Sequence, residues 1–332
     1  MTLRIALDAM GGDRAPGVVV EAALGMLERH RDLVIVLVGQ PAAVEPLLQG
    51  RRYDATRLQL HPASEVVEMT DKPAEALRRK KDSSLRVGAN LVKTGAVSAL
   101  VSAGNTGALM AISKYVLKTL PGIDRPAIAT RLPTLKGHTL MLDLGANVDC
   151  TPRHLVQFAL MGGVYMSQVH GLTAPRIGLL NIGEEDMKGN DLVRDAGELL
   201  RQAEPNYIGN VEGDDIFKGV ADVVVCDGFV GNVSLKTAEG VAKMLSQFLR
   251  DAFKEYFFAK LGYLVARPAL RRFRDRVDPR RYNGAMLLGL NGIVVKSHGG
   301  ADRLALENAI MVAMDLVRNR VNERIGERVT AL

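Results

Sequence analysis

The turn at residues 102–107, SAGNTG, has residue types suited to binding an anion. It follows a strand-like apolar run and precedes a helical pattern, so backbone N–H groups and the helix N-terminus converge on one point. The glycines permit close approach of the backbone to a ligand. The sequence also fits a tight turn in which serine or asparagine caps the helix. As phosphate ligands we expect Ser102, Gly104, Asn105, Thr106 and Gly107.

A second turn of this kind, CDGFVGN at 226–232, also lies between a predicted strand and a predicted helix. Asn232 fits either a helix cap or an amide that faces a carbonyl oxygen, and Lys236 lies one helical turn further on. Ligands of open α/β sheets bind at the carboxyl ends of strands. Two such turns on neighbouring strands predict a substrate with two separate polar groups. The first turn, at 102–107, is neither a P-loop nor a GxGxxG loop, which disfavours ATP and dinucleotides as ligands.

Further polar turns follow other predicted strands and contain carboxylates, amides or cations. Acids at such positions bind metals or act as bases, but they also cap helices, which we consider the more common role. KSHGGAD at 296–302 places a lysine and a histidine before the last helix. No zinc signature is present, and no local motif marks Cys226 as a nucleophile. The other candidate side chains are Asp8, Asp13, Asn147, Asn181, Lys188, Asp227, Lys296 and His298.

The elements that position these turns alternate between short apolar strands and amphipathic helices. This order predicts a doubly wound α/β fold with a mostly parallel sheet. Continuous runs of valine, isoleucine and leucine indicate strands that are buried on both faces. We expect one domain over residues 1–332, with two lobes as an alternative. The predicted strands are 3–8, 33–39, 97–101, 139–145, 177–183, 220–228 and 292–296.

Composition excludes several classes of protein. The chain is 47% hydrophobic and 24% charged, which is typical of a globular protein and not of a disordered one. Two cysteines in 332 residues cannot build a disulfide framework, which fits a reducing cytoplasm. No apolar run approaches the roughly 18 residues of a membrane span. Asp8 interrupts the first apolar stretch, so we expect no secretory signal.

One segment of the chain has a net charge equal to the formal charge of the whole protein, +6. Residues 254–281 contain nine basic and three acidic residues, and the rest of the chain contains 34 of each. Residues 253–282 also hold seven of the fifteen aromatic residues. We expect this segment to form a protruding helical hairpin with its turn between Lys260 and Pro268. Because charges elsewhere cancel, nucleic-acid binding is disfavoured.

Seven motifs in order resemble the PlsX-type phosphate acyltransferases, over residues 3–313. They are DAMGGD, SAGNTGAL, DLGANVDC, NIGEE with KGND, CDGFVGNVSLKT, YNGAMLLGLNG and KSHG. The resemblance implies a three-layer α/β/α fold related to phosphate acetyltransferases and isocitrate or isopropylmalate dehydrogenases, usually as a homodimer. One departure is Asp214, where we expect asparagine or arginine from the family.

The resemblance also implies a reaction. Acyl-acyl carrier protein and inorganic phosphate would give a long-chain acyl phosphate, which a membrane acyltransferase uses in phospholipid synthesis. No metal or organic cofactor is implied. Phosphate is itself a nucleophile, so the protein must desolvate it, position it and stabilise the oxyanion.

We expect phosphate at residues 102–107, with Lys296 or Lys188 balancing its charge. Asn232 and the N–H groups near Gly231 would face the oxyanion, and His298 would protonate the leaving sulfur. Asp8, Asp13, Asn147, Asn181, Asp227 and Lys236 are further candidates.

The basic hairpin has three interpretations. It fits an amphipathic element that contacts an anionic membrane surface reversibly, a docking site for the acidic acyl carrier protein, or a dimer interface. The first would make the protein cytoplasmic with peripheral membrane association. The contact residues would be Phe257, Phe258, Tyr263, Leu264, Arg267, Arg271 and Arg272.

Rival hypotheses remain at this point. A phosphate acetyltransferase acting on acetyl-CoA uses the same chemistry on a short chain. A non-catalytic membrane-associated scaffold would use only the fold and the hairpin. A decarboxylating dehydrogenase would need a nicotinamide site and an acidic metal cluster, neither of which the sequence shows.

Overall fold

The computed structural model describes residues 2–255 and 257–330. In these residues the strands are β1 (Leu3–Asp8), β2 (Leu33–Gly39), β3 (Leu58–Pro62), β4 (Ala99–Ser102), β5 (Ala127–Thr134), β6 (Gly137–Leu142), β7 (Ile177–Leu180), β8 (Tyr207–Val211), β9 (Val223–Val225), β10 (Ala285–Leu288) and β11 (Ile293–Lys296). Every predicted strand overlaps an observed one, whereas β3, β5, β8 and β10 were not predicted.

Helices separate most of these strands. They are α1 (Gly17–Arg29), α2 (Pro41–Leu48), α3 (Pro73–Arg79), α4 (Ser84–Lys93), α5 (Thr106–Leu117), α6 (Pro152–His170), α7 (Asp191–Ala203), α8 (Asp215–Lys218), α9 (Gly228–Glu255), α10 (Phe257–Val277), the 3-10 helix η1 (Pro279–Tyr282), α11 (Arg303–Arg318) and α12 (Val321–Thr330).

The strands form one sheet in the order β3-β2-β1-β4-β11-β10-β5-β6-β9-β7-β8. Most neighbouring pairs are parallel, which confirms the predicted sheet type. Strand β10 is antiparallel to β11 and to β5, and β5 is antiparallel to β6. The strands β6, β9, β7 and β8 therefore run opposite to β1, β4 and β11.

Helices cover both faces of the sheet, because its central strands are apolar on both sides. In β2 all seven residues are buried. Leu33, Ile35 and Leu37 belong to the core that also contains residues of α1, α6 and α11, whereas Val36 and Val38 pack with residues of α4 and α5. This alternation gives the expected three-layer α/β/α architecture.

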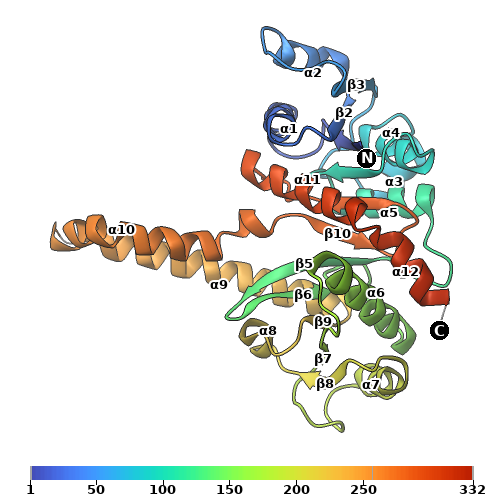
Figure 1. Cartoon of the computed structure of the whole chain (residues 1–332), viewed down its shortest axis with the longest axis vertical. Coiled ribbons are helices and arrows are strands. Elements are labelled where there is room, and N and C mark those ends of the chain that lie inside the picture. Colours follow the sequence, from blue (N-terminus) through green and yellow to red (C-terminus); the bar gives the residue numbers. More distant parts are fainter. Residues whose placement is uncertain (1, 256, 331–332) are drawn as a thin grey trace.

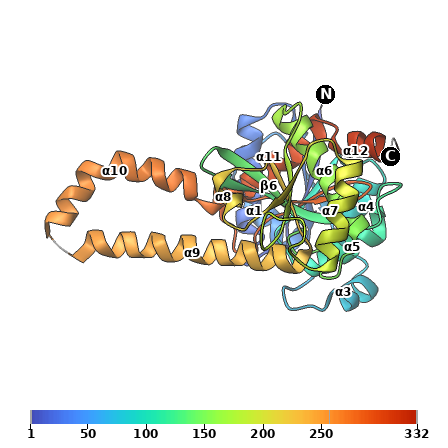
Figure 2. The same ribbon diagram turned by 90° about the horizontal axis from the view of Figure 1, so that it is seen from below.

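The helices α9 and α10 project from the body side by side, as Figures 1 and 2 both show. This confirms a protruding helical hairpin, but its geometry differs from the prediction. Helix α9 already begins at Gly228, and α10 runs through both Gly262 and Pro268. The predicted break at those two residues is therefore wrong. No helix in the described part of the chain is long and apolar enough to cross a bilayer.

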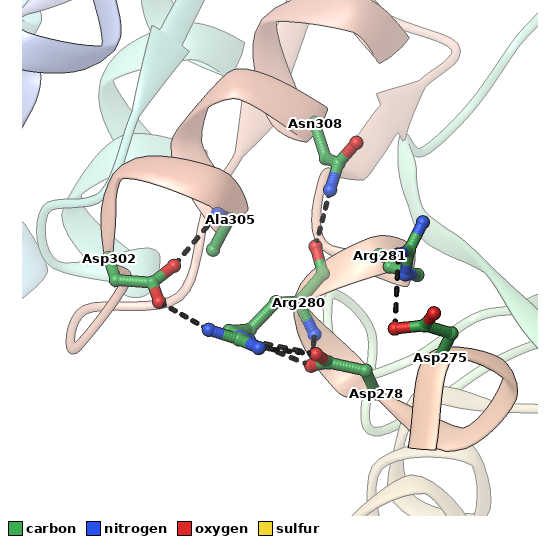
Figure 3. A network of polar contacts seen from close by, with 7 residues as sticks. All are labelled: Asp275, Asp278, Arg280, Arg281, Asp302, Ala305 and Asn308. Atoms are coloured by element: carbon green, nitrogen blue, oxygen red, sulfur yellow. Dashed lines mark hydrogen bonds and ion pairs between the residues drawn. The ribbon is translucent and has the colours of Figure 1, made fainter. Parts of the chain in front are cut away.

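An ionic network ties the base of this hairpin to the start of α11 (Figure 3). Arg280 donates to Asp278 Oδ2 at 2.6 Å and to Asp302 Oδ2 at 2.8 Å. Asp302 in turn caps α11 by accepting from the backbone N–H of Ala305 at 3.0 Å. Asn308 donates to the Arg280 carbonyl at 2.9 Å. The chain that returns from the hairpin is thus held against the segment that follows Lys296.

Candidate active site

Three polar turns meet at the carboxyl ends of β1, β4 and β11, which are neighbouring parallel strands. We call residues 8–13, 102–107 and 296–300 the first turn cluster. The backbone N–H of Asp13 donates to the Gly299 carbonyl at 2.9 Å, and that of Ser297 donates to the Ser102 carbonyl at 2.8 Å. The structure thus brings together Asp8, Asp13, the predicted phosphate turn, Lys296 and His298.

The side chain of Asp8 organises this cluster. Its Oδ2 accepts a hydrogen bond from Ser102 Oγ at 2.7 Å, and that hydroxyl accepts from the Gly104 N–H at 2.9 Å. Burial raises the pKa of the Asp8 carboxyl, and the hydrogen bond from Ser102 counteracts part of the shift. A Cβ at Gly11 would lie 2.2 Å from Asp8 Oδ2 and 2.7 Å from the Gly104 nitrogen. Only glycine at 11 lets the two turns approach so closely.

Lys296 is the buried cation of the cluster, with 8% of its surface exposed. Its Nζ donates to the Ser297 carbonyl at 2.5 Å. Burial lowers the pKa of Lys296 to about 8, and the carboxylates of Asp8 and Asp13 counteract part of that shift. The lysine therefore carries a positive charge at neutral pH but loses it at mildly alkaline pH.

The phosphate turn offers backbone donors more than side chains. The Oδ1 atom of Asn105 accepts from the Ala108 N–H at 3.0 Å, which caps α5. Its Nδ2 donates to the carbonyls of Met69 and Asp71, each at 2.9 Å. The Asn105 side chain is therefore fully used in structure, as the capping alternative predicted. Thr106 and Gly107, in the first turn of α5, are exposed.

His298 lies at the exposed rim of the cluster. Its Nδ1 accepts from the Gly300 N–H at 3.0 Å, so the neutral ring carries its proton on Nε2. The backbone N–H of His298 donates to Asn283 Oδ1 at 3.0 Å, and Asn283 Nδ2 donates to Ser297 Oγ at 2.7 Å. Asn283 positions this turn, and sequence reasoning did not identify it although it lies in the YNGAM motif.

A second group of turns follows β6, β9 and β7, which are also neighbouring parallel strands. We call residues 143–147, 181–190 and 226–232 the second turn cluster. Asp143 is fully buried and accepts from the N–H groups of Ile128 at 2.9 Å, Ala146 at 3.0 Å and Asn147 at 2.7 Å. Asn147 Nδ2 donates to the Pro126 carbonyl at 2.8 Å and to Asp143 Oδ2 at 2.9 Å. Both side chains therefore shape the turn.

Asn232 lies in the first turns of α9 and is exposed. It does not cap this helix, because Asp227 Oδ1 accepts from the N–H groups of Phe229 and Val230, each at 2.9 Å. Its amide faces Gly145: a Cβ built there would lie 3.5 Å from the Asn232 Cβ. Asp227 therefore caps α9, and a ligand-binding role for the Asn232 amide stays a prediction.

The remaining candidates of this cluster have surface or structural surroundings. Asn181 Oδ1 accepts from the Ile182 N–H at 2.8 Å, and its Nδ2 donates to the Lys188 carbonyl at 3.2 Å. The Lys188 side chain is exposed on the same loop. Lys236 forms an exposed ion pair with Glu239 at 2.9 Å. Of these residues, Lys188 alone presents a charged group that the described contacts do not use.

From the sequence we expected the two clusters to lie on neighbouring strands. This expectation is wrong. Strands β11, β10, β5 and β6 separate β4 from β9, and β9 runs opposite to β4. Helix α5 nevertheless starts beside α3, since a Cβ at Gly107 would lie 2.7 Å from Pro73 Cγ. Figure 2 shows α3 and the beginning of α9 toward the same side of the molecule.

Other groups with chemical potential lie elsewhere. Burial raises the pKa of the Cys226 thiol well above its usual range and that of Cys150 to about 11, so both are protonated near neutral pH. Glu212, Asp214 and Asp215 bring carboxylate oxygens within 4.8 Å of one another. Lys218 offsets part of this charge through ion pairs with Asp214 at 2.6 Å and Asp215 at 2.9 Å.

A hollow of about 570 Å³ lies at the β8 edge, where it borders the 181–190 loop of the second turn cluster. It is lined mainly by polar and charged side chains, among them Glu184, Asp186, Arg201 and Asn210. Such a lining does not suit an acyl chain, so we assign no substrate to it.

Two solved phosphotransacetylases share this fold. The EutD phosphotransacetylase of Staphylococcus aureus matches with a TM-score of 0.62 at 17% identity, over 95% of this chain and 94% of that one. A phosphotransacetylase of Streptococcus pyogenes matches with a TM-score of 0.63 at 19% identity, over 96% and 94%. At this identity the likeness defines the fold class.

Sequence relatives define the family. A family model described as fatty acid synthesis protein matches residues 3–324. A phosphate acyltransferase of Magnetococcus marinus is 60% identical over 335 residues, 99% of this chain and 96% of the relative. One of Methylococcus capsulatus is 58% identical over 327 residues, 98% and 96%. The chain belongs to this phosphate acyltransferase family of fatty acid synthesis proteins, which confirms the resemblance carried by its motifs.

Proposed function

We propose that the protein transfers a long-chain fatty acyl group from acyl-acyl carrier protein to inorganic phosphate, and that the acyl phosphate enters phospholipid synthesis. Its family supports acyl transfer to phosphate. The observation that carries the chemistry is the first turn cluster, where the buried Lys296 pairs in register with Ser102, the first residue of a glycine turn at a helix N-terminus. A cation and unpaired N–H groups in that arrangement suit an oxyanion.

Phosphate binds, in this proposal, to the N–H groups of the first turn of α5. Thr106 adds a hydroxyl, and Lys296 balances the charge. Because the Asn105 side chain caps the helix, it contributes by holding the turn and not by donating to phosphate. The neighbouring Asp8 is held by the Ser102 hydroxyl, which donates to its Oδ2 at 2.7 Å, and Lys296 offsets its charge.

The acyl thioester lies against the second turn cluster. The exposed amide of Asn232 and the exposed ammonium of Lys188 supply the donors there. A phosphate oxygen attacks the thioester carbonyl, and the Asn232 amide stabilises the oxyanion of the tetrahedral intermediate. The intermediate collapses with cleavage of the C–S bond. The thiolate takes a proton from water or from His298 in its imidazolium form. It is a feasible leaving group because such a thiol has a pKa of roughly 8.5.

The hairpin supports two further parts of the proposal, homodimer formation and reversible membrane contact. Helix α9 exposes an apolar row at helical spacing, which a second copy of the chain would cover. Its members include Val233, Val241, Met244, Leu245 and Phe248.

The far end of the hairpin suits an anionic membrane surface. On α10, Tyr263 and Leu264 are exposed by 43% and 61%, and Arg267, Arg271 and Arg272 are exposed as well. The side chains of Phe257 and Phe258, which we predicted to take part, lie outside the described residues. The protein would then be cytoplasmic and peripherally associated with the inner face of the cell membrane.

The deciding experiment measures acyl phosphate formation from long-chain acyl carrier protein and phosphate, with acetyl-CoA in parallel. We expect rapid, phosphate-dependent release of carrier thiol and slow reaction of acetyl-CoA. Preference for acetyl-CoA would favour a short-chain phosphate acetyltransferase. No reaction with either substrate would overturn the proposal and leave a scaffold role.

A further inference from the structure

A second basic segment lies outside the hairpin. Residues 72–118 contain nine basic and two acidic residues. Acidic residues elsewhere in the chain cancel this excess of positive charge, so the net charge outside the hairpin does not reveal it. This segment contains α3, α4 and α5. Figures 1 and 2 both show these helices on the side of the body opposite to the α9–α10 hairpin. The two basic surfaces can therefore serve different partners.

Two cations of this segment, Arg86 and Lys118, lie over an exposed aromatic ring. The Arg86 guanidinium carbon lies 4.6 Å from the centroid of the Tyr115 ring, and Lys118 Nζ lies 4.9 Å from it. These contacts join the start of α4 to the end of α5. Tyr115 is 54% exposed. We call this surface the α3–α5 basic face; its cations are Arg78, Arg79, Lys81, Arg86, Lys114 and Lys118.

Carboxylates of the protein do not neutralise this face. Within residues 2–255 and 257–330, none of its six cations forms an ion pair. The acids of the segment are Asp82, which accepts from Ser64, and Glu75 in the first turn of α3. Lys80, by contrast, is paired with Asp71 and is not counted in the face. Like charges held together without partners repel one another, and an acidic partner would relieve that repulsion.

The face is continuous with the first turn cluster. Helix α5 begins at the phosphate turn and ends beneath Arg86 and Lys118. Its 12 residues span roughly 18 Å at 1.5 Å per residue. Helix α3 starts against Gly107 of the same turn. A protein seated on this face would hold a tethered thioester within reach of the phosphate site.

We propose that the α3–α5 basic face docks an acidic helical carrier protein, the acyl donor of the reaction proposed above, on which this inference rests. Charge complementarity selects that occupant, and Tyr115 with Arg86 supplies the aromatic and guanidinium surface typical of interface centres. The hairpin remains available to the membrane surface and to the second copy of the chain. A carrier could thus deliver its acyl group while the enzyme stays on the membrane.

The test compares two double variants of the full chain, Lys81→Glu with Lys114→Glu, and Arg51→Glu with Arg52→Glu. Both change the charge equally, and Arg51 and Arg52 are exposed residues of the loop before β3, outside the face. Kinetics are measured with acyl carrier protein and with an acyl-pantetheine thioester that lacks the protein. Carrier binding is also measured directly by fluorescence anisotropy, and melting temperatures confirm folding.

We expect the Lys81/Lys114 variant to raise the KM and the Kd for the carrier by roughly tenfold at low salt, with turnover of the small thioester unchanged, because surface charges act mainly on association. The Arg51/Arg52 variant should match the wild type. Equal carrier binding by all three proteins would overturn the docking proposal. If the wild type cleaves neither thioester, the reaction proposal fails, while the anisotropy result still decides the docking site. Dissociation of a dimer by Lys81/Lys114, seen by sedimentation velocity, would assign the face to a second copy instead.

Discussion

Ser102 donates to Asp8 at 2.7 Å although the two residues lie 94 positions apart in the chain. This hydrogen bond joins the turns after β1 and β4 and fixes the hydroxyl that accepts from Gly104. Both side chains are almost completely buried. The shape of the predicted phosphate turn therefore depends on a carboxylate from the first strand.

Replacing Ser102 by alanine should destabilise the protein. The change leaves a buried carboxylate and the Gly104 N–H without their partner, which costs about 1–3 kcal/mol of unfolding free energy. Ser113→Ala is the matched control, since its buried hydroxyl has no hydrogen-bond partner among the described residues. Urea unfolding of both variants checks the prediction. Equal losses of stability would show that the Asp8–Ser102 bond contributes nothing specific.

Phosphate use should decline at mildly alkaline pH. Lys296 has its pKa lowered to about 8 by burial, so the free enzyme loses this cation as pH rises through that value. We expect kcat/KM for phosphate to fall up to tenfold per pH unit above about 8, because kcat/KM reports groups of the free enzyme. In Lys296→Met the value should be low at all pH and this decline should be absent. A decline that persists in the variant would assign the titration to another group.

The stability of the protein should increase over the same pH range in which phosphate use declines, because of the same lysine. Its folded pKa lies below the value of the unfolded chain, so the unfolded state binds more protons between about pH 8 and 10. The penalty for burying the charge is complete below pH 8 and decreases as pH rises. Unfolding free energies from pH 7 to 10 should therefore increase relative to those of Lys296→Met. A constant difference between the two proteins would contradict the pKa shift.

Asn232→Ala should lower kcat by roughly 10²- to 10³-fold, the usual effect of removing one oxyanion donor. The KM for the thioester should change little, because the developing oxyanion exists only in the transition state. Gln247→Ala on the same helix is the control, because among the described residues the exposed Gln247 side chain hydrogen-bonds only Asp251. Steady-state kinetics of acyl phosphate formation test this prediction. Normal kcat in Asn232→Ala would remove this residue from the mechanism.

Binding to anionic vesicles should depend on the hairpin arginines. Neutralising Arg267, Arg271 and Arg272 to glutamine removes about 1 kcal/mol each near the membrane surface, which is roughly a hundredfold in partitioning. Vesicle co-sedimentation at low salt measures it. The control neutralises Arg78, Arg79 and Lys81 on the opposite side of the body. Equal loss in both triple variants would point to net charge alone, and no loss in either would exclude the hairpin as the contact.

The sequence predicted the elements whose signal is local. Strands such as β2 are continuous apolar runs because both of their faces are buried, and this pattern is visible without tertiary information. Strand β8 is only partly buried, and its composition does not distinguish it from a loop. The insertion of β11 between β4 and β10 arises from pairing between distant segments. The strands β6, β9, β7 and β8 run opposite to β1, β4 and β11 because of the antiparallel pairs around β10 and β5. No local sequence pattern predicted this change of direction.

The candidate site was predicted as a set of turns, but not the role of each side chain. Asn105 and Asp227 cap helices, whereas Asn232, of the same chemical type, is free of that role. A cap and a ligand have the same sequence signature, and only the helix boundary distinguishes them. Asn283 and Arg280 act by contacts with residues 14 to 22 positions away, beyond the range of a motif.

Strand β11 is the last strand of the described chain, yet it lies in the middle of the sheet, paired with β4 over Ile293–Lys296. During synthesis, β1, β2, β3 and β4 leave the ribosome long before it, so one edge of β4 has no native partner until some 300 residues have been made. An apolar edge left open for that long favours aggregation. Lys296 arrives with the closing strand. The enzyme therefore gains its proposed anion site only when this open edge of β4 is paired. A nascent chain that stalls before that point lacks both the paired edge and the lysine on which we expect activity to depend.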